Sequence, residues 1–189
     1  MNTQIAHNGV DLSGVNVFVG GPIQHAIQGD GFHASLRETI SRVIDAVQDS
    51  NGTVFSAHLA EKFGDDTSLF TPEQVSMRDF GWMGQCDVFI PVLPTGQEEE
   101  LLRTDGTHVE LGWASALRKP IVLVTPLPIN PTASHLLRGL PRVGNVTMLD
   151  LAAVVERPES LLDVVGSVTV RPQVIAPAVT GDAAGAALR

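Results

Sequence analysis

The chain has little cysteine, few basic residues and no long apolar run, and each shortage narrows the kind of protein it can be. Cys86 is the only cysteine among 189 residues, so an intrachain disulfide is impossible, and a reducing cytoplasm is the simplest predicted setting. The opening MNTQIAHNGVDLSG has no basic start and no apolar core, so no signal peptide is predicted. No stretch approaches the length needed to span a membrane, and we expect no membrane partner.

Basic residues are outnumbered by acidic ones. Lys and Arg total 12 against 21 Asp and Glu, which gives a formal net charge of −9. This balance argues against broad binding to nucleic acid or to anionic membranes. A small phosphorylated ligand stays compatible with it, because backbone N–H groups and hydroxyls can hold a phosphate.

Several catalytic motifs are also missing. The sequence has no Gly-x-Ser-x-Gly elbow, no Gly-x-x-x-x-Gly-Lys phosphate loop and no pair of histidines at metal-binding spacing. We therefore expect neither a metal nor another cofactor. What remains is an ordinary globular composition, with 43% hydrophobic and 17% charged residues, and a length that suits one domain with its own core.

Apolar runs and amphipathic segments alternate along the chain. Short runs rich in β-branched residues predict five strands, and segments with apolar residues at helical spacing follow them. This alternation predicts a doubly wound, flavodoxin- or Rossmann-like α/β fold, with a five-stranded, mostly parallel sheet and helices on both faces. The predicted strands are residues 15–21, 53–59, 86–94, 120–128 and 143–150.

One domain accounts for most of the chain. We predict a flexible N-terminus over residues 1–13, a catalytic domain over 14–170 and a disordered tail over 171–189, because the tail is rich in Ala, Gly and Pro. In an open parallel sheet ligands bind beyond the carboxyl ends of the strands, so the predicted site lies after the strands that end near residues 20, 58, 94 and 126.

Glu110 in DGTHVELGWASALRKP is open to two interpretations. Thr107 and Glu110 have capping-box spacing, which would make the carboxylate a structural cap. Alternatively, Glu110 lies near a helix start at the ligand edge of the sheet, where the helix macrodipole would keep it ionised as a nucleophile for a sugar carbon. Gly106 leaves room beside it for a ligand.

Asp79 in SMRDFGWM also has two interpretations. It is either a solvated helix acid paired with Arg78 or Arg118, or the second carboxylate of a two-acid site. Trp82 and Trp113 are expected in the core or at a subunit contact, and His58 is expected to be a hydrogen-bonded wall residue of the cleft.

Three segments give the chain a family resemblance. VFVGGPI, RDFGWMGQCDVFIPVL and DGTHVELGWASALRKPIVLV resemble the opening turn, middle helix and signature segment of the nucleoside 2-deoxyribosyltransferase-like superfamily, from about Val15 to about Leu149. Within it, GTHVELGWASALRKP and AHLAEKFG are similar to the CMP and hydroxymethyl-CMP N-glycosidases of peptidyl-nucleoside antibiotic pathways. The deoxynucleoside 5′-monophosphate N-glycosidase is another similar hydrolase.

The resemblance implies a covalent mechanism. Glu110 would attack C1′ of the (deoxy)ribose while Asp79 positions the groups and assists proton transfer, and water would then release the sugar 5-phosphate. A CMP-like pyrimidine nucleoside 5′-monophosphate is the expected substrate. The alternatives are a deoxyribosyltransferase, in which a second base accepts the sugar, and a non-catalytic nucleotide sensor.

The resemblance also suggests phosphate contacts and an oligomer. Thr104 and Ser134 match phosphate-binding serines of the deoxynucleotide hydrolase, and the second of these reaches the phosphate from a neighbouring subunit, so a homodimer or higher homo-oligomer is expected. The CMP hydrolases carry a Phe-Arg pair where this chain has Ile23 and Gln24. The predicted substrate-binding set is Gly20, Gly21, Pro22, Ile23, His25, His58, Thr104, Gly106, Thr107 and Ser134.

Overall fold

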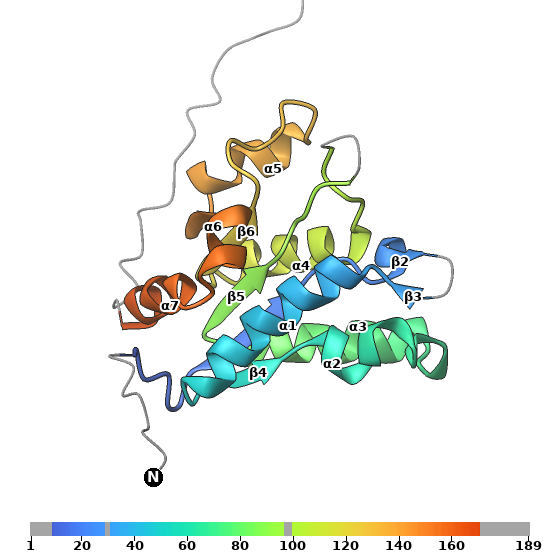
Figure 1. Ribbon diagram of the computed structural model, residues 1–189, viewed down its shortest axis with the longest axis horizontal. Helices are drawn as coiled ribbons and strands as arrows, with labels where there is room; N and C mark the ends of the chain where they lie inside the picture. Colours follow the sequence, from blue (N-terminus) through green and yellow to red (C-terminus); the bar gives the residue numbers. More distant parts are fainter. Residues whose placement is uncertain (1–8, 29–30, 97–99, 171–189) are drawn as a thin grey trace, which may run out of the picture.

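A five-stranded parallel sheet forms the centre of the protein, as predicted. The computed structural model describes residues 9–28, 31–96 and 100–170 (Figure 1). The sheet order is β4-β1-β5-β6-β7, and each neighbouring pair is parallel. The strands are β1 (Asn16–Gly20), β4 (Thr53–Phe55), β5 (Val88–Pro91), β6 (Ile121–Thr125) and β7 (Val146–Asp150).

Helices cover both faces of the sheet, which confirms the predicted doubly wound architecture. One face carries α1 (Ala34–Asp49), α6 (Leu151–Glu156) and α7 (Ser160–Val170). The other carries α3 (Pro72–Gln85), α4 (Asp105–Ala116) and α5 (His135–Gly139). In Figure 1, α1 crosses the front of the sheet and α4 lies behind it.

Side chains that alternate along each strand divide the core into two halves. Val17 and Val19 of β1 pack with α1, whereas Phe18 between them packs with α3 and α4. Because both faces are covered, every residue position of β5 and β6 is buried. This explains why the strands appear in the sequence as continuous apolar runs.

Short elements complete the fold around the ligand edge. A small antiparallel hairpin pairs β2 (Ile27–Gln28) with β3 (Gly31–Phe32). The remaining pieces are α2 (Ala57–Ala60), η1 (Gln24–Ala26), η2 (Lys62–Gly64), η3 (Thr67–Leu69) and η4 (Leu140–Arg142). In the described part of the chain, no helix has the length and apolar character to cross a membrane.

Two boundaries differ from the sequence-based expectation. The second strand ends at Phe55, and the predicted remainder turns into α2, so His58 lies on a helix. The folded part also starts before residue 14, because Leu12 is buried and its N–H donates to the Ser50 carbonyl at 2.7 Å. The predicted tail, 171–189, and residues 1–8 lie outside the described residues.

The order of the strands places the ligand edge. The chain leaves β1 through α1 to reach β4 on one side, and returns through α3 on the other face to reach β5 on the other side. Connections that leave in opposite directions open a crevice at the carboxyl ends of β1 and β5, which is where doubly wound proteins bind ligands.

Candidate active site

A cavity of about 190 Å³ opens at this crevice. Its wall combines the turn after β1, the segment from α2 to α3 and the start of α4. It is lined by Gly20, Gly21, Ile23, Gln24, His25, Ala57, His58, Glu61, Thr67, Val75, Asp79, Arg103, Thr104, Asp105, Gly106, Thr107 and Glu110.

The carboxyl group of Glu110 lies inside the cavity wall and not at the end of α4. The helix begins at Asp105 with Thr104 as its N-cap, so Glu110 is in its second turn. The predicted capping box is therefore wrong: the Thr107 hydroxyl accepts from the Thr104 hydroxyl at 2.6 Å, and Glu110 caps nothing. Glu110 is only 8% exposed, and its Oε2 atom is buried without a hydrogen-bond partner.

Gly20 creates the room that Glu110 occupies. A Cβ atom at position 20 would lie 2.7 Å from Glu110 Oε2, closer than such atoms approach, and 3.0 Å from the Phe89 ring, which is tighter than most Cβ contacts. The end of β1 must therefore carry no side chain for the acid to reach the cavity. At Gly106, by contrast, a Cβ would meet no atom within 4 Å, so this part of the rim is open, as expected for ligand access.

Burial makes the Glu110 carboxyl group a weaker acid than an exposed glutamate. Loss of water around the side chain, with a smaller contribution from the nearby Asp79 carboxylate, raises the pKa of Glu110 to about 8, although Arg78 opposes the change. Desolvation therefore opposes the ionised state that the macrodipole was expected to favour. The macrodipole acts mainly within the first turn, and desolvation is the stronger effect at this depth.

Asp79 lies on α3 opposite this acid and belongs to a buried ion-pair network. Arg78 donates to Asp79 Oδ1 at 2.7 Å and to Glu61 Oε1 at 2.7 Å, and Glu61 also accepts from Thr67 at 2.7 Å. Asp79 is 6% exposed, so the predicted pairing with Arg78 is present but the predicted solvation is not. Burial raises the pKa of Asp79 despite the guanidinium beside it.

An aromatic layer holds the guanidinium of Arg78 in place. It lies 4.9 Å from the Trp82 ring centroid and 5.3 Å from that of Phe70. Trp82 in turn stacks on Phe55. It therefore packs in the core beneath the site and does not line the cavity.

His58 supports the turn after β1. It is fully buried, its Nε2 lies 3.2 Å from the Pro22 carbonyl, and its Nδ1 lies 3.5 Å from the Ser56 hydroxyl. Burial lowers the pKa of His58 to about 4, so the ring is neutral at physiological pH. A neutral ring that donates to Pro22 holds the turn, which agrees with the predicted wall role.

The cavity brings together most of the predicted site residues but not all of them. Pro22 is buried behind the turn, and Ser134 is exposed, accepts from the Leu136 N–H as N-cap of α5 and does not line the cavity. The predicted residues that line it are Glu110, Asp79, Gly20, Gly21, Ile23, His25, His58, Thr104, Gly106 and Thr107.

Three charged groups of the site were not predicted from the sequence. Glu61 is buried at 3% exposure although it lies in a short segment that shows no helical or strand periodicity. Arg103 and Asp105 flank Thr104 at the rim. Within residues 9–28, 31–96 and 100–170, no three or more His, Cys, Asp or Glu side chains form a group that could hold a metal ion.

The fold and cavity define a doubly wound α/β protein with a carboxylate-lined ligand site at its switch point. Residues 28–134, more than half of the chain, match the model of the nucleoside 2-deoxyribosyltransferase family. The chain belongs to this family. Among curated protein sequences, none matches it significantly.

Two solved structures share the fold. The CMP N-glycosidase BcmB of Clostridium botulinum aligns with a TM-score of 0.54 and 23% identity, over 79% of this chain and 98% of that one. The solution structure of BlsM aligns with a TM-score of 0.63 and 26% identity, over 85% of this chain and 97% of that one.

Replacing Glu110 by a neutral amide of similar shape tests the cost of burying the acid. Between the ordinary pKa of 4.5 and about 8, the native protein keeps a proton that the unfolded chain releases. The wild-type free energy of unfolding must therefore fall as pH rises through this window. In urea unfolding curves, Glu110→Gln should match the wild type near pH 4 and exceed it by a few kcal/mol at pH 8.

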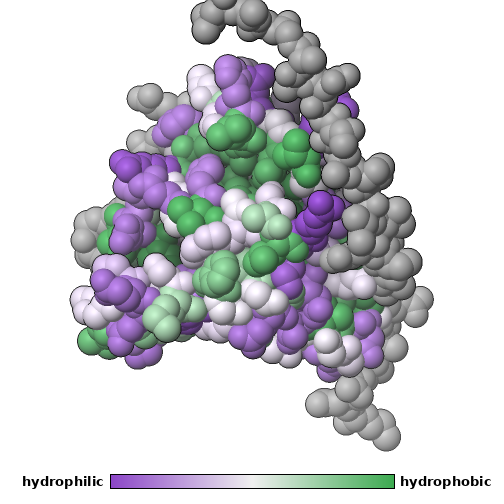
Figure 2. Space-filling model, turned by 180° about the vertical axis from the view of Figure 1, so that it is seen from behind, coloured by the Kyte–Doolittle hydropathy of each residue, from purple (hydrophilic) through white to green (hydrophobic). Residues whose placement is uncertain are grey.

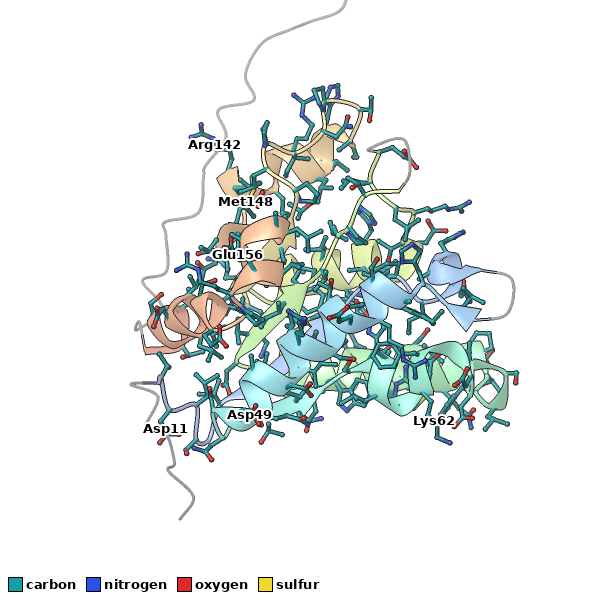
Figure 3. All side chains as sticks on the ribbon, viewed as in Figure 1. Asp11, Asp49, Lys62, Arg142, Met148 and Glu156 are labelled. Atoms are coloured by element: carbon teal, nitrogen blue, oxygen red, sulfur yellow. The ribbon has the colours of Figure 1, made fainter. Side chains whose placement is uncertain are left out.

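The matched control is Glu156→Gln, because Glu156 is exposed on α6 (Figure 3). The difference in unfolding free energy between this variant and the wild type should not change across the same pH range. If the Glu110→Gln difference is equally constant, Glu110 does not hold its proton in the folded protein.

Proposed function

We propose that the protein hydrolyses the N-glycosidic bond of a CMP-like pyrimidine nucleoside 5′-monophosphate, giving the free base and a (deoxy)ribose 5-phosphate. The observation that carries this proposal is the side chain of Glu110, which lines a cavity together with Asp79 while its buried Oε2 atom has no hydrogen-bond partner. A carboxyl group that is not tied to the protein by a hydrogen bond, in the wall of a ligand-sized space, is available to a carbon atom of a substrate.

The two carboxyl groups divide the chemistry between them. Glu110 is protonated in the free enzyme at neutral pH, so its proton must leave before attack, and Asp79 is the neighbouring carboxylate that can take it. The Glu110 oxygen then bonds to C1′ as the C–N bond breaks, and the bond's electron pair stays on the base. Asp79 returns the proton to the base.

Water completes the reaction. A water molecule that occupies the space left by the base attacks C1′, passes one proton to Asp79 and displaces the Glu110 carboxylate. The sugar 5-phosphate leaves with a free anomeric hydroxyl. Arg78 keeps Asp79 oriented throughout the reaction, because the Arg78 guanidinium is also held by its hydrogen bond to Glu61.

The start of α4 supports a phosphorylated substrate. Thr104 and Thr107 place buried hydroxyl groups in the cavity wall, and the first N–H groups of α4 have no partner within the helix. Hydroxyls and helix N–H groups bind phosphate well. The family match favours one alternative, a transferase in which a second base and not water accepts the sugar from the same intermediate.

A substrate panel tests the reaction. The protein should release free base from a pyrimidine 5′-monophosphate, and base release should be slower from the matching nucleoside, because the nucleoside lacks the phosphate contacts. Chromatography of the products, with and without a second base, separates hydrolysis from transfer. Glu110→Gln should lose more than about a thousandfold in kcat, since it removes the nucleophile.

Circular dichroism of Glu110→Gln provides the folding control. A folded variant that keeps its activity excludes Glu110 as the nucleophile. Nucleotide binding by calorimetry without base release from any member of the panel would instead identify a sensor and overturn the proposed hydrolysis.

The pH dependence of the reaction should report the same carboxyl group. Because the reaction uses the proton of Glu110 to protonate the leaving base, kcat/KM should be level at neutral pH and fall about tenfold per pH unit above pH 8, where the free enzyme loses this proton. Initial rates at low substrate concentration, from pH 6 to 10, measure this profile. A profile that rises through neutral pH and stays high above pH 8 would show that the reaction needs an ionised Glu110 and does not use its proton.

We also propose that the protein forms a homodimer through α3 and α4. Met77 is 78% exposed, Phe80 50% and Val109 51%, and the Phe80 ring packs edge-on against Trp113 at 5.2 Å. Figure 2 views the molecule from behind and shows exposed apolar residues on that side. Ser134 begins α5 on the same face of the sheet, so a second subunit docked there could bring its Ser134 to the cavity.

Light scattering after size-exclusion chromatography tests the dimer. Phe80→Glu should shift the protein from dimer to monomer, because it would bury a charge in an apolar contact. Val155→Glu is the control, since Val155 is a partly exposed apolar residue on α6, on the other face. A wild-type protein that is already monomeric, or equal dissociation of both variants, would exclude this interface.

A further inference from the structure

We propose that Arg103 recognises the 5′-phosphate of the substrate and that Asp105 holds the Arg103 guanidinium before the substrate binds. This inference rests on the proposed function, because it concerns the substrate of the same cavity. It makes Arg103 the residue that distinguishes a nucleotide from a nucleoside.

The charge of the cavity wall requires such a group. Four carboxyl groups, those of Glu61, Asp79, Asp105 and Glu110, line the cavity; the first three belong to ion pairs and Glu110 keeps its proton. Arg103 is the only Lys or Arg among the described residues that line it. The turn after β1 contributes only the neutral Ile23 and Gln24 before His25. A dianionic phosphate would be repelled by this wall unless a cation faces it.

The position of Arg103 fits this role. It directly precedes Thr104, whose hydroxyl is in the cavity wall, and it follows the open stretch of chain that leads into α4. A phosphate at the start of α4 would lie near the N–H groups of the first turn and the Thr104 hydroxyl. The Arg103 guanidinium could donate two parallel hydrogen bonds to it. The open space over Gly106 leaves the approach clear.

The Asp105 carboxylate accepts hydrogen bonds from the Arg103 guanidinium in the same geometry that a phosphate would use. Arg103 Nη2 donates to Asp105 Oδ2 at 2.7 Å, and its Nε donates to Oδ1 at 3.0 Å, a forked pairing that two phosphate oxygens could replace. Hydrogen bonds from Arg103 lower the pKa of Asp105, and the nearby His25 and His108 act in the same direction. Basic groups therefore gather at this point of the rim.

The exchange of partners is easy because both side chains are exposed. The side chains of Arg103 and Asp105 are 69% and 68% exposed, so water screens the pair and it contributes little to the fold. By contrast, Arg78 is locked between two buried carboxylates and is not free to move toward a ligand. Arg78 is thus a fixed cation behind the cavity wall, and Arg103 is an exposed cation at the rim.

Three variants test the assignment by kinetics. Arg103→Ala should lower kcat/KM for the 5′-monophosphate about tenfold or more, mainly through KM, and leave the matching nucleoside unchanged. Arg103→Lys should recover only part of the loss, because an ammonium group cannot form the forked contact. Asp105→Asn should lower KM for the monophosphate, since it removes the competing carboxylate. The matched control is Arg42→Ala, because Arg42 is also an exposed arginine paired with an acid, Glu38, on α1.

A binding experiment separates this inference from the proposed reaction. Calorimetry with ribose 5-phosphate and with ribose should show that the phosphate improves binding to the wild type and to Arg42→Ala but not to Arg103→Ala. If no substrate releases base yet this pattern holds, the reaction is wrong and the phosphate assignment stands. If base is released but Arg103→Ala affects nucleotide and nucleoside equally, or neither of them, the assignment of Arg103 is overturned.

Discussion

The carboxyl group of Glu110 is buried against the end of β1, where its Oε2 atom has no hydrogen-bond partner. Burying an unpaired polar group costs free energy, and burying an unpaired charge costs more, so the protein keeps this group protonated. The rest of the site is arranged around that constraint. Gly20 gives the acid space, the switch point gives it a cavity, and the aromatic layer fixes the charges that surround it.

The neighbouring charges are balanced in a different way. Arg78 bonds both Glu61 and Asp79, so two buried carboxylates share one guanidinium, and the charge near Glu110 stays limited. His58 and Glu110 respond to pH in opposite directions. The lowered pKa of His58 removes stability as pH falls from 6.5 toward about 4, whereas the raised pKa of Glu110 removes stability as pH rises from 4.5 toward about 8. Through these two groups alone, stability is greatest at mildly acidic pH, below the range in which an ionised Glu110 is available.

The sheet and its helices could be predicted because continuous apolar strands and amphipathic helices leave strong periodic signals. The rule for parallel strands placed Gly20 and His58 at the edge of the sheet that holds the cavity, whereas Thr104 was predicted from the family resemblance. The described residues that directly follow β5 and β6, which the same rule named, do not line this cavity. The start of α4 could not be placed from four residues, because the Thr107–Glu110 spacing also occurs one turn inside a helix that begins at Asp105. Glu61 was missed because its burial depends on Arg78, a contact between segments that carries no local pattern.

The close approach of Gly20 to Glu110 links two positions that are far apart in the chain. A methyl group at position 20 would push the acid out of its place, and only a shorter acid at position 110 would restore the fit. Among related sequences, a side chain at position 20 is then tolerated only together with a shorter residue at position 110. The lack of a side chain at Gly20 in β1 therefore determines how far the Glu110 side chain of α4 extends toward the sheet. It also determines how deep the cavity is at this point.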